Sequence, residues 1–182
     1  LLQVFLIFFI AITLTACSTI NSAKLWAPES FGMVAIATQI YVDREMEESD
    51  RVELVEAINT ARQRIRLYYG SILSNPQIIA CSTKECFQKI GGITARAKAY
   101  GASKLLLSPR GLAAPIITHE WSHAELNTRI GGYFEMGRFP RWFDEGLAVV
   151  VSNEPTHSEA AWQAIQEAGI TVPTLAELET QE

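Results

Sequence analysis

The chain has 182 residues, of which 48% are apolar and 19% charged, with a formal net charge of −5 and a pI near 5.3. This length suits one modest domain that buries a core of its own. An acidic chain lacks the overall positive charge that neutralises phosphates, so the composition argues against a nucleic-acid partner.

Residues 1–16 carry no charge, and residues 4–12 form an unbroken apolar run. Nine residues are too few for a membrane-spanning helix, which needs roughly 20, and they match the apolar core of a secretory signal peptide. No basic segment precedes this run. The following "LTAC" resembles the lipobox of bacterial lipoproteins, which implies lipidation at Cys17 and removal of residues 1–16. The alternatives are a plain signal peptide or a buried cysteine in a short apolar helix.

The same resemblance implies a location for the mature chain. Ser18 follows Cys17, and the absence of aspartate at this position is typical of lipoproteins sorted to the outer membrane. We therefore expect a protein of the cell envelope, anchored by lipid and facing the periplasm. Residues 17–30 are expected to form a polar tether, and residues 31–182 a single domain.

The domain is expected to begin with strands and helices in alternation. Apolar and β-branched composition predicts strands over 31–42, 76–82 and 102–108. Apolar residues recurring every three or four positions predict a helix over 49–69, ended by Gly70, and a weaker helix over 84–101 that contains Gly91 and Gly92. After residue 108 we expect only helices, over 113–130, 139–153 and 157–169. The predicted class is α+β, with a small sheet of about three strands or more.

Two cysteines, Cys81 and Cys86, lie five positions apart in "ACSTKEC". If the chain is exported, its surroundings are oxidising and favour a disulfide over free thiols. A structural zinc site is a third interpretation, but it needs four ligands and no further Cys or His lies nearby in the sequence.

The segment "HEWSH" places His119 and His123 four positions apart on the predicted helix over 113–130. Residues i and i+4 project from the same helix face, so both imidazoles can bind one metal ion. Catalytic zinc usually takes three protein ligands, so a third must come from elsewhere. Glu120 is offset by one position, which suits a base beside the bound water. The alternative is a pair of ordinary, hydrogen-bonded histidines.

The segment "WFDEGLA" offers Glu145 as the third ligand, with 21 residues between His123 and Glu145. Together with HExxH, this pattern resembles the gluzincin metallopeptidases, such as thermolysin and aminopeptidase N. The match to the aminopeptidase pattern lies at Trp142, Glu145, Gly146 and Ala148, whereas Leu147 replaces an aromatic residue. The spacing is slightly longer than in those two enzymes. The alternative for Glu145 is a solvated carboxylate near the start of a helix.

The resemblance covers roughly residues 100–153 and implies a zincin-like fold: a small mixed sheet, then the active-site helix, then a helix that carries the third ligand. It implies zinc as the cofactor and a peptide or protein as the substrate. Zinc held by two imidazoles and a carboxylate lowers the pKa of a bound water toward about 7. Glu120 would accept the proton of that water and later deliver it to the departing amine.

Supporting residues are less well defined by the sequence. Asn127, one turn after His123, is placed to contact a metal-bound histidine, although thermolysin-like enzymes have an aspartate there. Those enzymes also have a carboxylate where this chain has Val149. Tyr133 and His157 are candidates to stabilise the oxyanion, with a packing role for Tyr133 and a surface position for His157 as the alternatives. Trp121 and Trp142 are expected in the core.

Three further expectations concern what the site binds. Strand 102–108, which precedes the active-site helix, is expected to be an edge strand that pairs with extended substrate, unless it lies inside the sheet. The chain lacks the large C-terminal domain of thermolysin, so the cleft should be open or completed by a protein partner. Two other functions fit the same residues: a zincin-fold binding lipoprotein without turnover, and a metal-dependent amidase acting on a non-protein component of the cell envelope.

Overall fold

The computed structural model describes residues 24–132, 139–154 and 157–179, which form an α+β fold with one five-stranded mixed sheet. Tyr133 lies outside these residues, as do the expected signal peptide and Cys17. The elements run in the order η1 (Pro28–Phe31), β1 (Met33–Ala37), β2 (Ile40–Asp43), α2 (Glu48–Tyr69), β3 (Gln77–Ala80), α3 (Lys84–Lys89), β4 (Ala97–Tyr100), β5 (Lys104–Leu107), α4 (Ala114–Arg129), α6 (Arg141–Ser152), α7 (Glu159–Glu167) and α8 (Leu175–Glu179).

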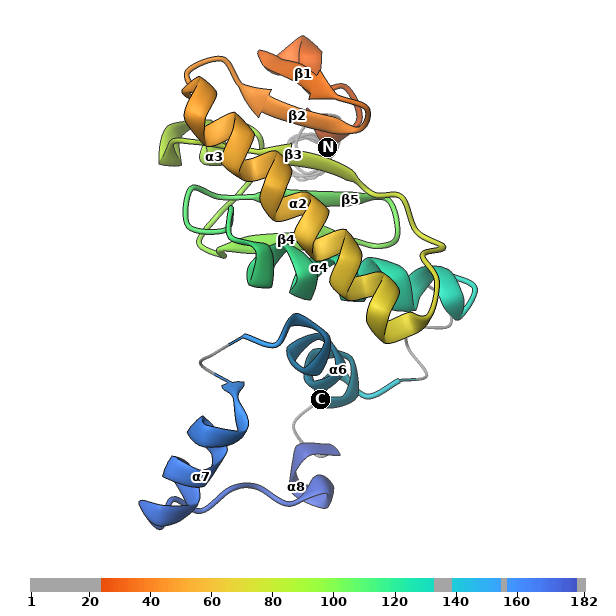
Figure 1. Ribbon diagram of the computed structural model, residues 1–182, viewed down its shortest axis with the longest axis vertical. Coiled ribbons are helices and arrows are strands. Elements are labelled where there is room, and N and C mark those ends of the chain that lie inside the picture. The colour runs from red at the N-terminus through yellow and green to blue at the C-terminus, as the bar shows by residue number, and fades with distance from the viewer. Residues whose placement is uncertain (1–23, 133–138, 155–156, 180–182) are drawn as a thin grey trace, which may run out of the picture.

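The strands are ordered β1-β2-β3-β5-β4 across the sheet (Figure 1). The central strands β2, β3 and β5 are parallel, whereas β1 and β4 pair antiparallel with their neighbours. The expectation that strand 102–108 is an edge is therefore wrong, because β5 lies between β3 and β4. All four of its residues are buried, as the apolar run "LLL" requires. The edge strand next to helix α4 is β4.

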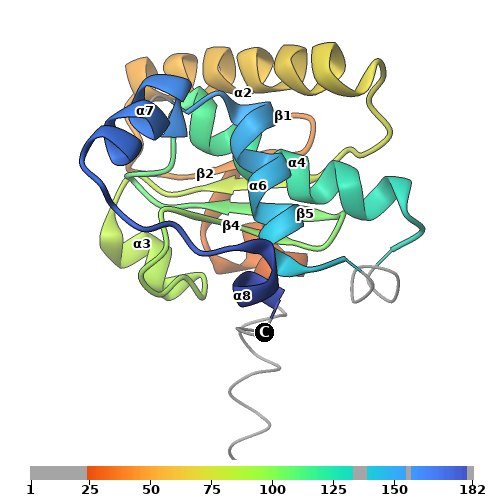
Figure 2. The same cartoon turned by 90° about the horizontal axis from the view of Figure 1, so that it is seen from below.

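Helices α2 and α4 lie together on one face of the sheet (Figures 1 and 2). The main core lies beneath them and includes Leu54, Ile58 and Ile65 of α2 with Ile117 and Trp121 of α4. A second, smaller core on the opposite face holds Phe87 and Ile90 from the α3 region and Leu25 from the N-terminal segment. In the described parts of the chain, no helix is both long and apolar enough to cross a membrane.

Two predicted elements differ from the structure. The strand expected over 31–42 is a hairpin of β1 and β2, since the chain turns at Gln39, whose φ is 65°. The helix expected over 84–101 ends at Lys89, and β4 occupies its second half. Gly91 and Gly92 follow this end, and a Cβ atom at Gly92 would lie 2.4 Å from the Phe87 ring, so the close approach of loop and helix requires glycine there.

The packed chain begins before the expected end of the tether at residue 30. Leu25 is 5% exposed and belongs to the second core, and η1 follows it directly. Because Leu25 and Phe31 pack in the second core, residues 24–31 are part of the fold. The helices expected over 49–69, 113–130, 139–153 and 157–169 correspond to α2, α4, α6 and α7 within a few residues.

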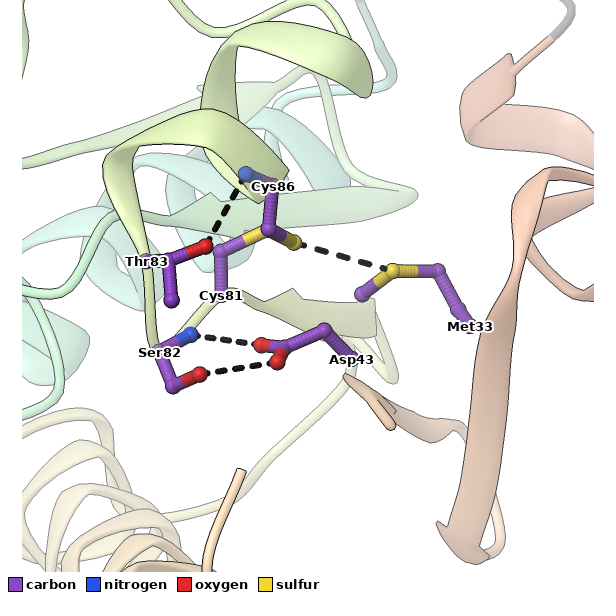
Figure 3. Close-up of a disulfide and its surroundings, with 6 residues drawn as sticks. All are labelled: Met33, Asp43, Cys81, Ser82, Thr83 and Cys86. Atoms are coloured by element: carbon purple, nitrogen blue, oxygen red, sulfur yellow. Dashed lines mark hydrogen bonds between the residues drawn. A yellow bond between two sulfur atoms is a disulfide. The ribbon is translucent and has the colours of Figure 1, made fainter. Parts of the chain in front are cut away.

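Cys81 and Cys86 form a disulfide, with their Cα atoms 5.6 Å apart (Figure 3). It joins the residue after β3 to the first turn of α3, where Thr83 Oγ1 accepts a hydrogen bond from the Cys86 N–H. Asp43 at the end of β2 accepts hydrogen bonds from the Ser82 N–H and hydroxyl, at 2.6 and 2.8 Å. These contacts fix the β3–α3 turn to the end of β2 and join the start of α3 to the end of β3.

Candidate metal centre

Helix α4 presents both histidines on one side because its opposite side is fixed in the core. Trp121 and Ala124 are 1% and 0% exposed, and Trp121 donates a hydrogen bond to the Ser74 hydroxyl. His119 and His123 then project away from this buried side, and their ring centroids lie 4.9 Å apart. The i and i+4 spacing thus brings the two imidazoles together, as the helix geometry predicts.

Helix α6 brings Glu145 to the two imidazoles. It packs on α4, and Val151, which is 4% exposed, joins the main core together with Ile117 and Trp121 of α4. Glu145 Oε2 lies 3.4 Å from His119 Nε2 and 3.8 Å from His123 Nε2. Tetrahedral zinc ligands, each about 2.1 Å from the ion, lie about 3.4 Å from one another. The three side chains are close enough to hold one metal ion, and their donor set of two imidazoles and a carboxylate fits zinc.

Asp144, the residue before Glu145, holds the second histidine. Its Oδ1 lies 2.8 Å from His123 Nδ1. With the proton on Nδ1, the ring donates to this carboxylate, and the lone pair of Nε2 faces Glu145 and the metal position. Asp144 is not among the residues predicted from the sequence, where Asn127 is the candidate for such a contact. Asn127 is 5% exposed and lines the adjacent cavity, but the carboxylate at His123 comes from α6.

Glu120 points to the edge strand. Its Oε2 accepts a hydrogen bond of 2.7 Å from the backbone N–H of Ala99 in β4. The carboxylate is therefore oriented by the sheet while its helix positions it between the two histidines. This contact also connects α4 with the edge of the sheet. The sequence does not predict this link, because its pattern indicates a helix over residues 97–100.

Burial and neighbouring charges set the protonation of these groups. Burial, together with the nearby His123, lowers the pKa of His119, which favours the neutral ring that binds metals. Burial raises the pKa of Glu120. Burial would lower the pKa of His123, but the hydrogen bond and charge of Asp144 outweigh it, so the pKa of His123 is raised.

Two cavities flank the metal centre. The first, about 400 Å³, is lined by residues 97–99 and Gly101 of the edge, by α4, and by Arg141, Asp144 and Glu145. The second, about 370 Å³, lies against Arg96, Glu154 and His157. Both share His119, Glu120 and Glu145. The candidate centre is thus open to ligand on two sides.

The structure also describes the other predicted residues, His157, Trp121 and Trp142. His157 lines the second cavity, and its Nδ1 lies 3.6 Å from Glu154 Oε2. The other carboxylate oxygen of Glu154, Oε1, pairs with Arg96 at 2.9 Å. Trp121 is in the core as expected. Trp142 is partly buried on α6, and its indole nitrogen has no hydrogen-bond partner among the described residues.

Comparison with known proteins adds no further constraint on this site. No family model matches the sequence, and neither the curated proteins nor the solved structures include a significant match to this chain.

Proposed function

We propose that this chain is a zinc-dependent metallopeptidase with a zincin-like fold, anchored in the cell envelope through lipid on Cys17. The observation that carries the proposal is the convergence of His119, His123 and Glu145 from two helices, with Glu120 beside them at an open sheet edge. A structural zinc site needs no carboxylate at such a position, whereas hydrolysis needs a base.

Each residue of the candidate centre has a separate role in the proposed hydrolysis. Zinc bound by His119, His123 and Glu145 would supply the Lewis acidity that activates water and polarises a peptide carbonyl. Glu120 accepts a proton from the attacking water and returns it to the departing amine, so that water and peptide give a carboxylate and an amine. Asp144 keeps the His123 ring in the tautomer and orientation that ligation requires.

The edge strand supports an extended peptide as the substrate. Residues 97–99 line the first cavity, and among the described residues no strand pairs with the outer side of β4. A substrate that adds to this edge as a further strand would lie across the base and the ligands. Because the second cavity continues beyond His119 and Glu145, chain can extend on both sides of the cleaved bond, which favours an endopeptidase.

Zinc analysis and a Glu120→Gln variant test the proposal together. We expect about one zinc per purified chain, lost in His123→Ala and Glu145→Gln variants. The Glu120→Gln variant should retain zinc and lose hydrolysis of a quenched fluorescent peptide library by about 10²-fold or more, since it lacks the base.

Glu53→Gln, at an exposed position on α2, is the matched control and should keep both zinc and activity. A wild-type chain that binds no zinc contradicts the proposed centre. Unchanged hydrolysis by Glu120→Gln contradicts the assigned role of Glu120 even if the metal is present.

A further inference from the structure

Positive charge is concentrated in two segments of this acidic chain. All five lysines, Lys24, Lys84, Lys89, Lys98 and Lys104, lie within residues 24–32 and 84–110. These segments contain seven lysines and arginines but only two carboxylates, Glu29 and Glu85, although the whole chain carries a net charge of −5. The distribution is therefore strongly asymmetric.

The fold brings these segments together on the sheet face opposite α2 and α4. Leu25 and Phe87 both pack into the second core. The Lys24 ammonium donates a hydrogen bond of 2.8 Å to the Lys89 carbonyl, which ties the N-terminal segment to the end of α3. On the adjoining strands, Lys104 lies 4.3 Å from the centroid of the Trp26 ring and Lys98 lies 5.1 Å from that of Tyr100.

Large apolar side chains are exposed among these lysines. Trp26 is 71% exposed and Ile93, in the loop after α3, is 81% exposed. Lys84, Lys89 and Lys98 are exposed as well. We call this surface the basic face and define it by Lys24, Trp26, Lys84, Lys89, Ile93 and Lys98.

We infer that the basic face lies against a bilayer that contains anionic lipid. Exposed tryptophan among lysines matches the chemistry of the membrane interface, where the indole ring sits among headgroups and the ammonium groups contact phosphates. Cys17, the expected lipidated residue, precedes Lys24 by seven positions, so an anchored chain holds this face near the lipid. Each lysine near an anionic surface strengthens binding by about fivefold.

This inference depends on the proposed membrane anchoring but not on the proposed hydrolysis. It concerns how the anchored domain is oriented. The basic face and the first cavity share Lys98 on the edge strand β4, and the candidate metal centre lies beyond this edge, between β4, α4 and α6. The test therefore uses no catalytic measurement, and loss of zinc or activity leaves its result interpretable.

The experiment compares the full chain in phosphatidylcholine vesicles with and without phosphatidylglycerol. Flotation with both vesicle types reports anchoring. Acylation of individual lysines by an amine-reactive ester, followed by peptide mass spectrometry, shows which surface of the domain lies against the bilayer. We expect acylation of Lys84, Lys89 and Lys98 to slow by roughly fivefold with anionic lipid and to recover at high salt. An Arg66→Lys variant supplies an exposed amine on α2, and its acylation should not change.

Two charge-matched variants make the test specific. The double variant Lys84→Gln with Lys89→Gln should abolish the protection of Lys98 from acylation. It should also abolish the quenching of Trp26 fluorescence by brominated lipid. A Trp26→Phe variant identifies the part of the fluorescence that comes from Trp26. Arg62→Gln with Arg66→Gln removes the same charge from α2 and should preserve both. Equal acylation rates in the two vesicle types overturn the inference. Protection by a soluble polyanion but not by anionic vesicles also overturns it, because the partner would then be a macromolecule and not lipid.

Discussion

Neighbouring residues on α6 make two different contacts with α4. Consecutive positions on a helix are rotated by about 100°, so Asp144 and Glu145 reach different atoms of the same histidine pair. Glu145 Oε2 approaches both Nε2 atoms, whereas Asp144 contacts His123 Nδ1 from behind. His119 has no corresponding support, because its buried Nδ1 has no hydrogen-bond partner among the described residues. We therefore expect metal affinity to depend strongly on Asp144.

An Asp144→Asn substitution tests this dependence. Asparagine preserves the shape and can still accept from the ring, but it removes the charge that favours the His123 orientation, so zinc should bind about 10–100-fold more weakly. Competition with a fluorescent zinc chelator measures the change. Asp50→Asn, an exposed change in the first turn of α2, should leave the affinity as it was. Equal affinities for both variants would show that the Asp144 contact does not orient the ligand.

The sequence pointed to the candidate ligands more clearly than to the residues that support them. His119 and His123 are related by local helix geometry, and Glu145 stands in a recognisable segment, so all three could be named before the structure. Asp144 could not, because its contact depends on how α6 packs on α4. Only one feature of the sequence points to Asp144: it directly precedes Glu145, the expected ligand. A carboxylate at this position of α6 can also face α4.

At the scale of elements, α4 is held by a buried carboxylate outside the metal centre. Glu125 is 0% exposed and accepts hydrogen bonds from the Leu73 and Ser74 backbone N–H groups and from the Ser74 hydroxyl. It also pairs with Arg129 at 2.9 Å. Burial alone would raise the pKa of Glu125, but these hydrogen bonds and the Arg129 charge lower it overall. This carboxylate fixes the loop after α2 to α4, and thereby the direction of the helix that carries His119 and His123.

A Glu125→Gln variant should therefore lose stability. The amide cannot satisfy the same set of buried donors, so we expect the free energy of unfolding to fall by about 1–3 kcal/mol in urea titrations. The exposed Glu53→Gln variant should change it by less than about 0.5 kcal/mol. If the two variants unfold at the same urea concentration, the buried network contributes little to stability.

The missed strand β4 shows where the sequence pattern gave the wrong element. The segment "AKAY" consists largely of good helix formers and follows α3 closely, so it was predicted as helix. In the structure it is extended because Ala97 to Tyr100 pair with Leu107 to Lys104 of β5. That pairing is set by tertiary contacts, including the close approach of Gly111 to the Arg96 backbone, where a Cβ atom would lie 2.2 Å from the carbonyl oxygen. The long helices were predictable because their apolar periodicity is local.

For the whole molecule, the disulfide is the covalent constraint on the second core. Cys81 is fully buried, and Cys86 Sγ lies 4.0 Å from Met33 Sδ of β1 (Figure 3). The bond therefore fixes α3, which covers the sheet face opposite α2, to the end of a central strand.

Replacing both cysteines by alanine should lower the free energy of unfolding by roughly 2 kcal/mol, because so short a loop restricts the unfolded chain only modestly. Thermal unfolding should shift downward by about 4–8 °C. Treating the wild type with a reductant should give the same shift, while zinc content stays constant because the centre lies on other elements. A wild type unaffected by reductant would indicate that the two thiols are not joined.

Strand β4 also has features that limit self-association of this molecule. An open strand edge offers backbone groups to any extended chain, including the edge of a second molecule. Here the edge is only four residues long and carries an exposed lysine at position 98, and the Ala99 N–H is already bonded to Glu120. The carboxylate assigned to proton transfer therefore also occupies part of the edge that would otherwise promote self-association.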